Sequence, residues 1–176
     1  MPVIRLPGNA GPGLAFVTTT VIEWLPVFSR SEIARVIASQ LAETACIKSC
    51  SITGYVVMPS HVHMLVGLAN MRCLSSFVQS FKSLSSRRVR KLINEEYADL
   101  LYRSGRFHLW MRRLDDVVIT SDTHFRTKLD YIHSNPVKAD IATDAVSWQY
   151  SSARCWLLNE PGIVPIDKNF RWIPEG

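Results

Sequence analysis

The 176-residue sequence has no apolar run of the roughly 18 to 20 residues that a membrane-spanning helix requires. Its start, MPVIRLPGNAGPG, is rich in proline and glycine and has no long apolar segment, so we expect a flexible leader over residues 1–13 rather than a secretory signal. Internal repeats and low-complexity tracts are also lacking. A chain of this length has room for one core, so we expect one domain over residues 14–160 and a tail over residues 161–176.

Cysteine is scarce, and its spacing follows no disulfide framework. The four residues are Cys46, Cys50, Cys73 and Cys155. The first two could in principle hold a metal, but no second pair with matching spacing exists. We therefore expect free thiols and a cytoplasmic protein. A glycine-rich P-loop is absent as well, so no motif for ATP binding is present.

Positive charge is present and unevenly distributed. The net charge is +5, and residues 71–113 contain ten of the 20 Lys and Arg residues. Clustered cations favour a polyanionic partner such as nucleic acid, although a solvated helix face would look the same. The candidate DNA-binding residues on the second expected helix are Lys82, Arg87, Arg88, Arg90 and Lys91.

Hydrophobic patterning alternates between strand and helix signals. Runs rich in β-branched and aromatic residues predict strands over residues 14–25, 48–59, 61–68 and 108–119. Apolar residues at helical spacing predict helices over residues 29–47, 74–97 and 121–136, and a short helix is expected within SWQYSSARCW, residues 147–156.

The expected helix ends rest on local signals. Ser31 is the candidate N-cap of the first helix, and Ser121 or Asp122 that of the third. Pro136 is expected to stop the third helix, because the residue before a proline avoids helical geometry. The order β-α-β-β-α-β predicts an α+β, ferredoxin-like antiparallel sheet with helices on one face and an appended C-terminal helix. That fold hosts many functions, so it does not decide this one.

The stretch GYVVMPSHVHMLVGL contains two histidines, His61 and His63, inside an expected strand. Residues i and i+2 of a strand face the same side, so the two imidazoles project together. They could bind one divalent metal and leave a coordination position open, or they could be half-buried histidines with local hydrogen bonds.

The late helix carries a second candidate pair in YIHSNP. Tyr131 and Asn135 are four residues apart and therefore share a helix face. An asparagine oxygen suits Mg²⁺ or Mn²⁺, and a tyrosine one turn away could attack a phosphate. Taken alone, Tyr131 could equally be a packing residue. His133 lies off this face, and we expect it to be structural or exposed.

Four segments together carry a resemblance to a known family: GYVVMPSHVHMLV, LWMRRLDDVVI, LDYIHSNPVKADI and YSSARCW. In this order, over roughly residues 14–156, the chain resembles single-strand tyrosine transposases with an HUH motif, and within them the REP-associated branch. In two places it departs from the family pattern. Ser60 stands where asparagine is usual, and Asp116 where histidine is common.

The resemblance implies a site and a reaction. His61 and His63 match the family's paired metal-binding histidines, Tyr131 its nucleophile, and Asn135 the polar residue that completes the metal site. It implies metal-dependent cleavage and rejoining of single-stranded or hairpin DNA through a 5′-phosphotyrosine, with Mg²⁺ or Mn²⁺ as cofactor. It also implies a monomer or a homodimer and leaves open whether the element is still mobile.

Two other readings remain. A replication initiator or plasmid relaxase would use the same chemistry, but such enzymes tend to be longer proteins with further domains. A catalytically inactive or non-enzymatic single-strand nucleic-acid-binding module would need exposed aromatic residues on the central strands for base stacking. The run HVHMLVGL offers histidines and aliphatic residues instead.

Overall fold

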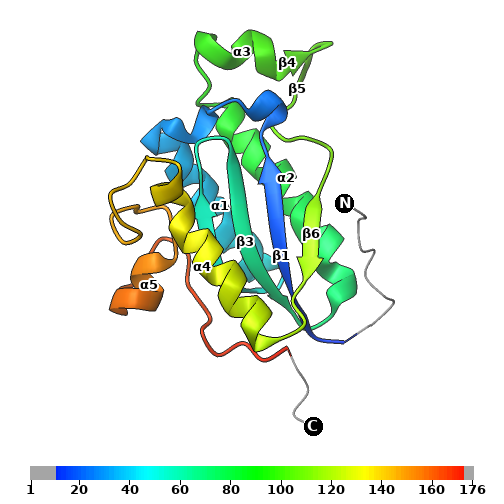
Figure 1. Ribbon diagram of the computed structural model, residues 1–176. Helices are drawn as coiled ribbons and strands as arrows, with labels where there is room; N and C mark the ends of the chain where they lie inside the picture. Colours follow the sequence, from blue (N-terminus) through cyan, green and yellow to red (C-terminus); the bar gives the residue numbers. More distant parts are fainter. Residues whose placement is uncertain (1–10, 173–176) are drawn as a thin grey trace.

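A four-stranded antiparallel sheet forms the centre of the computed structural model, which describes residues 11–172 (Figure 1). The strands lie in the order β2 (Ser51–Val57), β3 (His61–Leu68), β1 (Gly13–Thr20) and β6 (Asp115–Val118). With β1 and β3 paired in the middle, this is the ferredoxin-like arrangement, and the expected α+β fold class is confirmed.

One face of the sheet is covered by two long helices, α1 (Ser31–Ile47) and α2 (Leu74–Arg90), which lie behind the strands in Figure 1. Their apolar residues recur at helical spacing, and those at Ile37, Leu41 and Phe77 are fully buried. They pack on the side chains of β1 and β3 that point to this face, such as Val17 and Met64.

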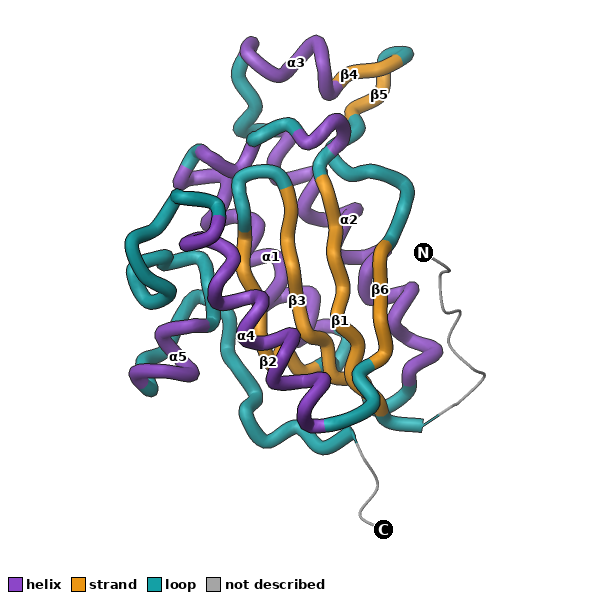
Figure 2. Tube along the Cα trace, in the orientation of Figure 1, coloured by secondary structure: helices purple, strands orange, loops and turns teal. Residues whose placement is uncertain are grey.

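The other face is covered by α4 (Asp122–Lys138), which lies in front of the sheet in Figures 1 and 2. A second apolar cluster joins Phe125, Leu129 and Ile132 of this helix to Phe16 and Leu65 of the sheet. Alternation along β3 therefore sends one set of side chains to the main core and the other set, which begins with the two histidines, towards α4.

The ends of the helices differ from expectation in two places. The expected cap at Ser31 is wrong: Arg30 is the N-cap of α1 without a side-chain bond, and the Ser31 hydroxyl contacts the Tyr150 hydroxyl instead. The expected stop at Pro136 is also wrong, because α4 runs on to Lys138. A proline removes only one donor, and the last carbonyls still accept bonds from the N–H groups that follow, including that of Ile141. At the start of α4, Ser121 is the cap, and its hydroxyl accepts from the His124 N–H.

The region between α2 and α4 is less regular than expected. The helix expected over 74–97 divides into α2 and a short α3 (Glu95–Leu101). A small hairpin of β4 (Tyr102–Arg103) and β5 (Arg106–Phe107) follows. Of the strand expected over 108–119, only β6 joins the sheet, while Trp110 forms an isolated bridge to Val21.

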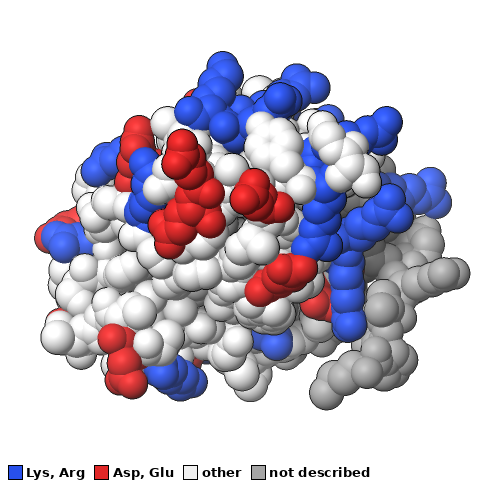
Figure 3. Space-filling model, turned by 90° about the horizontal axis from the view of Figure 1, so that it is seen from above, with Lys and Arg blue, Asp and Glu red and all other residues white. Residues whose placement is uncertain are grey.

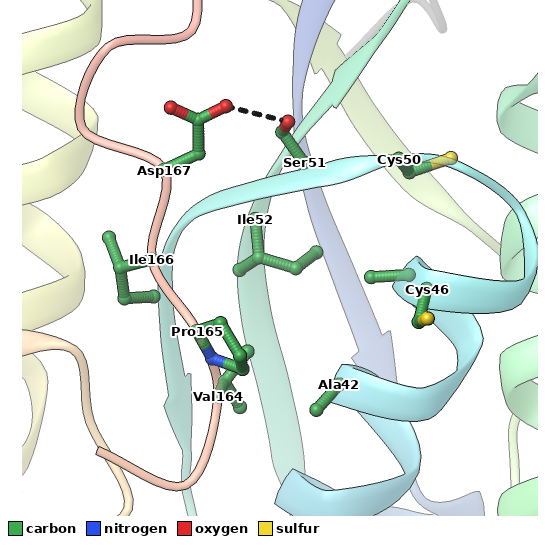
Figure 4. A pocket seen from close by; sticks show the side chains of 10 residues that line it. Ala42, Cys46, Cys50, Ser51, Ile52, Val164, Pro165, Ile166 and Asp167 are labelled. Atoms are coloured by element: carbon green, nitrogen blue, oxygen red, sulfur yellow. Dashed lines mark hydrogen bonds between the residues drawn. The ribbon is translucent and has the colours of Figure 1, made fainter. Parts of the chain in front are cut away.

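The described part of the chain ends with α5 (Ala153–Leu158) and an irregular segment that packs on the sheet. Phe170 of this segment lies over Gly67, where an added Cβ would come within 2.7 Å of the ring. A cavity of about 290 Å³ separates part of the segment from α1, and across it Ser51 donates a 2.8 Å hydrogen bond to Asp167 (Figure 4). The domain boundaries stay predictions, and most of the expected leader lies outside the described residues.

All four cysteines are free thiols, as expected. No helix within residues 11–172 combines the length and the apolar character needed to cross a membrane.

Candidate active site

The beginning of strand β3 places His61 and His63 side by side on the face of the sheet that α4 covers. Their ring centroids are 4.7 Å apart. Antiparallel pairing sets His63 opposite Thr18 of β1, and the Thr18 hydroxyl lies 2.8 Å from the His63 Nδ1. The Ser60 hydroxyl contacts the His61 Nδ1 at 3.2 Å. Neighbouring hydroxyls therefore hold both rings through Nδ1.

The remaining nitrogen of His63 has no partner. This Nε2 is buried and makes no hydrogen bond to the described part of the chain. Burial, helped by the charges of His61 and Lys128, lowers the pKa of His63 to about 3, and burial alone lowers the pKa of His61. Both rings are therefore neutral at pH 7, which is the form that binds a metal. A buried imidazole nitrogen left free next to a second imidazole fits a divalent metal.

Tyr131 lies across from these histidines on α4. Its ring centroid is 5.2 Å from that of His63 and 6.0 Å from that of Phe16, both in edge-to-face geometry. The side chain is 41% exposed, so the phenol can meet a ligand from solvent. Because α4 docks on the sheet through other residues, this ring is free to face the site.

Asn135 lies one turn further along the same helix face. Its Nδ2 makes a long, 3.4 Å hydrogen bond to the Tyr131 carbonyl, and its oxygen accepts no bond from residues 11–172. Within those residues Asn135 makes no hydrogen bond to either histidine, and no cluster of three His, Cys, Asp or Glu side chains could hold a metal. The structure thus brings together His61, His63 and Tyr131, with Asn135 adjacent to the tyrosine.

Two lysines that were not predicted from the sequence lie near the Tyr131 ring. The Lys128 Nζ lies 6.0 Å from the Tyr131 ring centroid and 4.7 Å from that of Phe16, and the Lys138 Nζ lies 5.9 Å from the Tyr131 centroid. Neither ammonium has an acidic partner among the described side chains. Their positions, three residues before and seven after the tyrosine, could have pointed to them.

His133 is structural, one of the two roles expected for it. It is buried, and its Nε2 lies 2.9 Å from the Ser152 hydroxyl. That hydroxyl also accepts a 3.0 Å bond from the Tyr55 N–H of β2. Burial lowers the pKa of His133 to about 4, so the ring is neutral at pH 7. The contact ties the middle of α4 to the edge of the sheet.

The five basic residues proposed for DNA binding have different surroundings. Lys82 is half-buried and donates to two backbone carbonyls, and Arg88 forms a two-bond ion pair with Glu43. The Arg90 Nε donates to the Tyr102 hydroxyl. Arg87 and Lys91 have no side-chain partner in the part of the chain that the structure describes.

A shallow cavity of about 370 Å³ lies where α2 meets the β4–β5 hairpin. Arg87, Arg90 and Arg106 all line it. Seen from above, Lys and Arg side chains gather on the right of the molecule, with Asp and Glu towards the left and middle (Figure 3). The β4–β5 hairpin projects beyond the end of the sheet (Figure 1), so this basic cavity lies at that end, where α2 meets the hairpin.

Comparison with known proteins agrees with the geometry. The chain is similar in structure to a REP-associated tyrosine transposase bound to a REP hairpin, with a TM-score of 0.69 and 18% identity, covering 96% of this chain and 94% of that chain. It is also similar to a putative transposase from Deinococcus radiodurans R1, with a TM-score of 0.53 and 21% identity, covering 74% of this chain and 95% of that one. No curated protein matches its sequence.

Sequence identities this low to solved structures show a shared fold only. Membership of a family is decided by the match to a model of the sequence family. The model of the family described as "Transposase IS200 like" matches residues 20–135, which is more than half of the chain. The match includes the histidine strand and the tyrosine helix. The chain belongs to the family of IS200-like transposases.

Proposed function

We propose that this transposase cleaves and rejoins single-stranded DNA through a covalent link between Tyr131 and a 5′-phosphate, with a divalent metal as cofactor. One observation carries the proposal: an exposed phenol lies 5.2 Å, ring to ring, from a histidine whose buried Nε2 has no partner. A nucleophile next to imidazole nitrogens that can bind a metal is what metal-assisted phosphoryl transfer requires.

His61 and His63 would hold the metal through Nε2, because hydroxyls already occupy the Nδ1 atoms. The Asn135 oxygen is the candidate third ligand and would need to turn towards the histidines. An amide oxygen suits Mg²⁺ or Mn²⁺. When bound, the metal supplies Lewis-acid polarisation of the scissile phosphate.

In the first step, the Tyr131 oxygen attacks the scissile phosphorus and loses its proton to water. The bond between phosphorus and the 3′ oxygen breaks, and that oxygen leaves as a 3′-hydroxyl after taking up a proton. The phosphotyrosine keeps the energy of the broken bond, so a 3′-hydroxyl can later reverse the step without ATP. Packing against Phe16 and His63 limits the orientation of the phenol before the attack.

Lys128 and Lys138 position the substrate. Their ammonium groups lie 6.0 Å and 5.9 Å from the centroid of the Tyr131 ring and have no acidic partner among the described side chains. A scissile phosphate at the phenol would therefore lie near two cations, which offset the negative charge that increases during transfer.

The basic cavity at the β4–β5 hairpin would bind phosphates of the DNA backbone. Arg87, Arg90 and Arg106 line it, whereas Arg88 is paired with Glu43 and Lys82 with backbone carbonyls. Of the DNA-binding residues proposed from the sequence, Arg87, Arg90 and Lys91 are thus the stronger candidates. The structural relative bound to a REP hairpin supports a hairpin substrate. A REP-associated activity, a cytoplasmic location and a monomeric or homodimeric state stay proposals from the sequence.

A cleavage assay tests the proposal. Wild type, Tyr131→Phe and the control Tyr97→Phe, which removes a partly exposed tyrosine hydroxyl on α3, are incubated with a pool of single-stranded DNA hairpins and Mn²⁺. We expect a covalent adduct from wild type and the control and none from Tyr131→Phe. Mass spectrometry should locate the 5′-phosphate on Tyr131. Binding without any adduct in wild type would favour the non-catalytic alternative, and an adduct on another tyrosine would reject the assignment.

A further inference from the structure

An exposed tryptophan lies beside the histidine pair and has no role in the site described so far. Trp24 ends the 3₁₀ turn η1 (Ile22–Trp24), is 58% exposed, and has its ring centroid 5.5 Å from that of His61. The planes meet at 70°, an edge-to-face contact that leaves most of the indole open to solvent. The other tryptophans of the described chain are buried or partly buried.

The turn holds this side chain in an unfavourable backbone conformation. Glu23 and Trp24 have φ angles of 54° and 57°, a region that residues other than glycine rarely adopt, and here two of them are consecutive. Such strain persists only where surrounding contacts impose it, and it is concentrated at functional sites.

The contacts that impose the conformation come from three parts of the chain. The Val21 N–H donates to the Ser60 carbonyl at 2.8 Å, directly before His61, and the Ile22 N–H donates to the Leu109 carbonyl at 2.9 Å. Glu23 forms an ion pair with Arg103 of the β4–β5 hairpin. The indole is therefore fixed relative to the histidines without being part of the core.

We propose that Trp24 stacks on an unpaired nucleobase of the DNA strand next to the scissile phosphate. The inference rests on the proposed function, because that function places the phosphate between His63 and Tyr131. The ring contacts run from Trp24 to His61, from His61 to His63, and from His63 to Tyr131, so the strand that enters the site passes the indole.

An unpaired base is the occupant that fits this surface. Single strands expose flat aromatic faces, and proteins bind these by stacking them on aromatic side chains, with little dependence on sequence. An indole fixed before binding loses little conformational entropy when a base covers it. The His61 edge contact leaves the indole accessible, as stacking requires. A base-paired duplex would not offer such a face, so the subsite selects unpaired nucleotides.

Binding of two fluorescent oligonucleotides in EDTA tests the inference without cleavage. One is an oligothymidine of about 12 nucleotides, and the other has the same length and charge but only abasic nucleotides. Wild type should bind the thymidine strand more tightly. Trp24→Ala should weaken that binding about 5- to 150-fold and leave the abasic strand unaffected. Trp24→Phe should retain part of the preference for the thymidine strand. The control Leu157→Ala, at a 61% exposed apolar residue, should retain the whole preference.

The outcomes that would contradict the inference can be told apart. If wild type does not prefer the strand with bases, or if Trp24→Ala weakens both strands equally or neither, the stacking role is wrong. A change of oligomeric state in sedimentation, with the base preference intact, would instead make Trp24 a contact between protein copies and also overturn the inference. Hairpin cleavage by wild type is measured in parallel: its absence rejects the proposed function, whereas its presence with no base preference rejects only the role of Trp24.

Discussion

Replacing Ser152 with alanine should loosen the attachment of α4 to the sheet. The Ser152 hydroxyl accepts from the Tyr55 N–H at 3.0 Å, lies 3.3 Å from the Tyr55 carbonyl, and contacts the His133 Nε2 at 2.9 Å. All three residues are buried. Alanine would remove one oxygen and leave two buried polar groups, the Tyr55 N–H and the His133 Nε2, without a partner.

The expected cost follows from those two groups. Each unsatisfied buried group costs about 1–3 kcal/mol, so the free energy of unfolding should fall by about 2–5 kcal/mol once local relaxation recovers a part. For a chain of this size, that lowers the melting temperature by roughly 4–20 °C. The control Ser134→Ala removes a hydroxyl that donates to the Tyr131 carbonyl of the same helix at an exposed position, and it should cost under about 1 kcal/mol.

Urea unfolding followed by circular dichroism measures both variants, and a double mutant shows whether the two groups act together. His133→Leu combined with Ser152→Ala removes both side-chain partners at once, so its cost should be clearly smaller than the sum of the single costs. Adduct formation with hairpin DNA should slow in Ser152→Ala more than in Ser134→Ala, since α4 carries Tyr131. A stability change below about 0.5 kcal/mol in Ser152→Ala would refute the reasoning.

Three further predictions concern packing, pH and DNA. Gly54→Ala should destabilise the protein by about 1–3 kcal/mol in thermal unfolding, because the new Cβ would meet Leu129 Cδ1 of α4 at 2.8 Å. In EDTA, the free energy of unfolding should decrease as the pH falls from about 6.5 to about 4, because burial lowers the pKa of His133 to about 4 and the unfolded chain binds the proton first. His133→Gln should reduce the slope of the unfolding free energy against pH by about one proton, as measured by urea unfolding at a series of pH values. Arg87→Ala should reduce the slope of log affinity for DNA against log salt concentration by about one unit. Arg88→Ala, which breaks an ion pair with Glu43, should change this slope less. Equal changes of slope in anisotropy titrations would contradict this distinction.

Local pattern was enough to predict the parts of the site that belong to one element. His61 and His63 share a strand face, and Tyr131 and Asn135 share a helix face, because spacing along one element fixes direction. The element order gave the correct sheet for the same reason: β-branched runs and helical apolar spacing alternate clearly along the chain.

Contacts between distant elements could not be predicted in this way. The Thr18 partner of His63 depends on the register of β1 against β3, and the Ser152 partner of His133 depends on where the chain after α4 returns to β2. The exposed Trp24 was read as part of a strand, because β-branched and aromatic residues continue to that point. Only the tertiary bonds of the turn show that the strand has already ended.

The spacing of residues within YIHSNP follows from the buried and the exposed faces of α4. Ile132, His133 and Pro136 are buried and hold the helix on the sheet, and His133 does so through a hydrogen bond. Tyr131 and Asn135 fall between them on the side that faces the histidines and solvent. Shifting the tyrosine by one position would turn the phenol about 100° around the helix, away from the His63 ring. The order of residues in this short motif therefore couples the docking of the helix to the direction of its nucleophile.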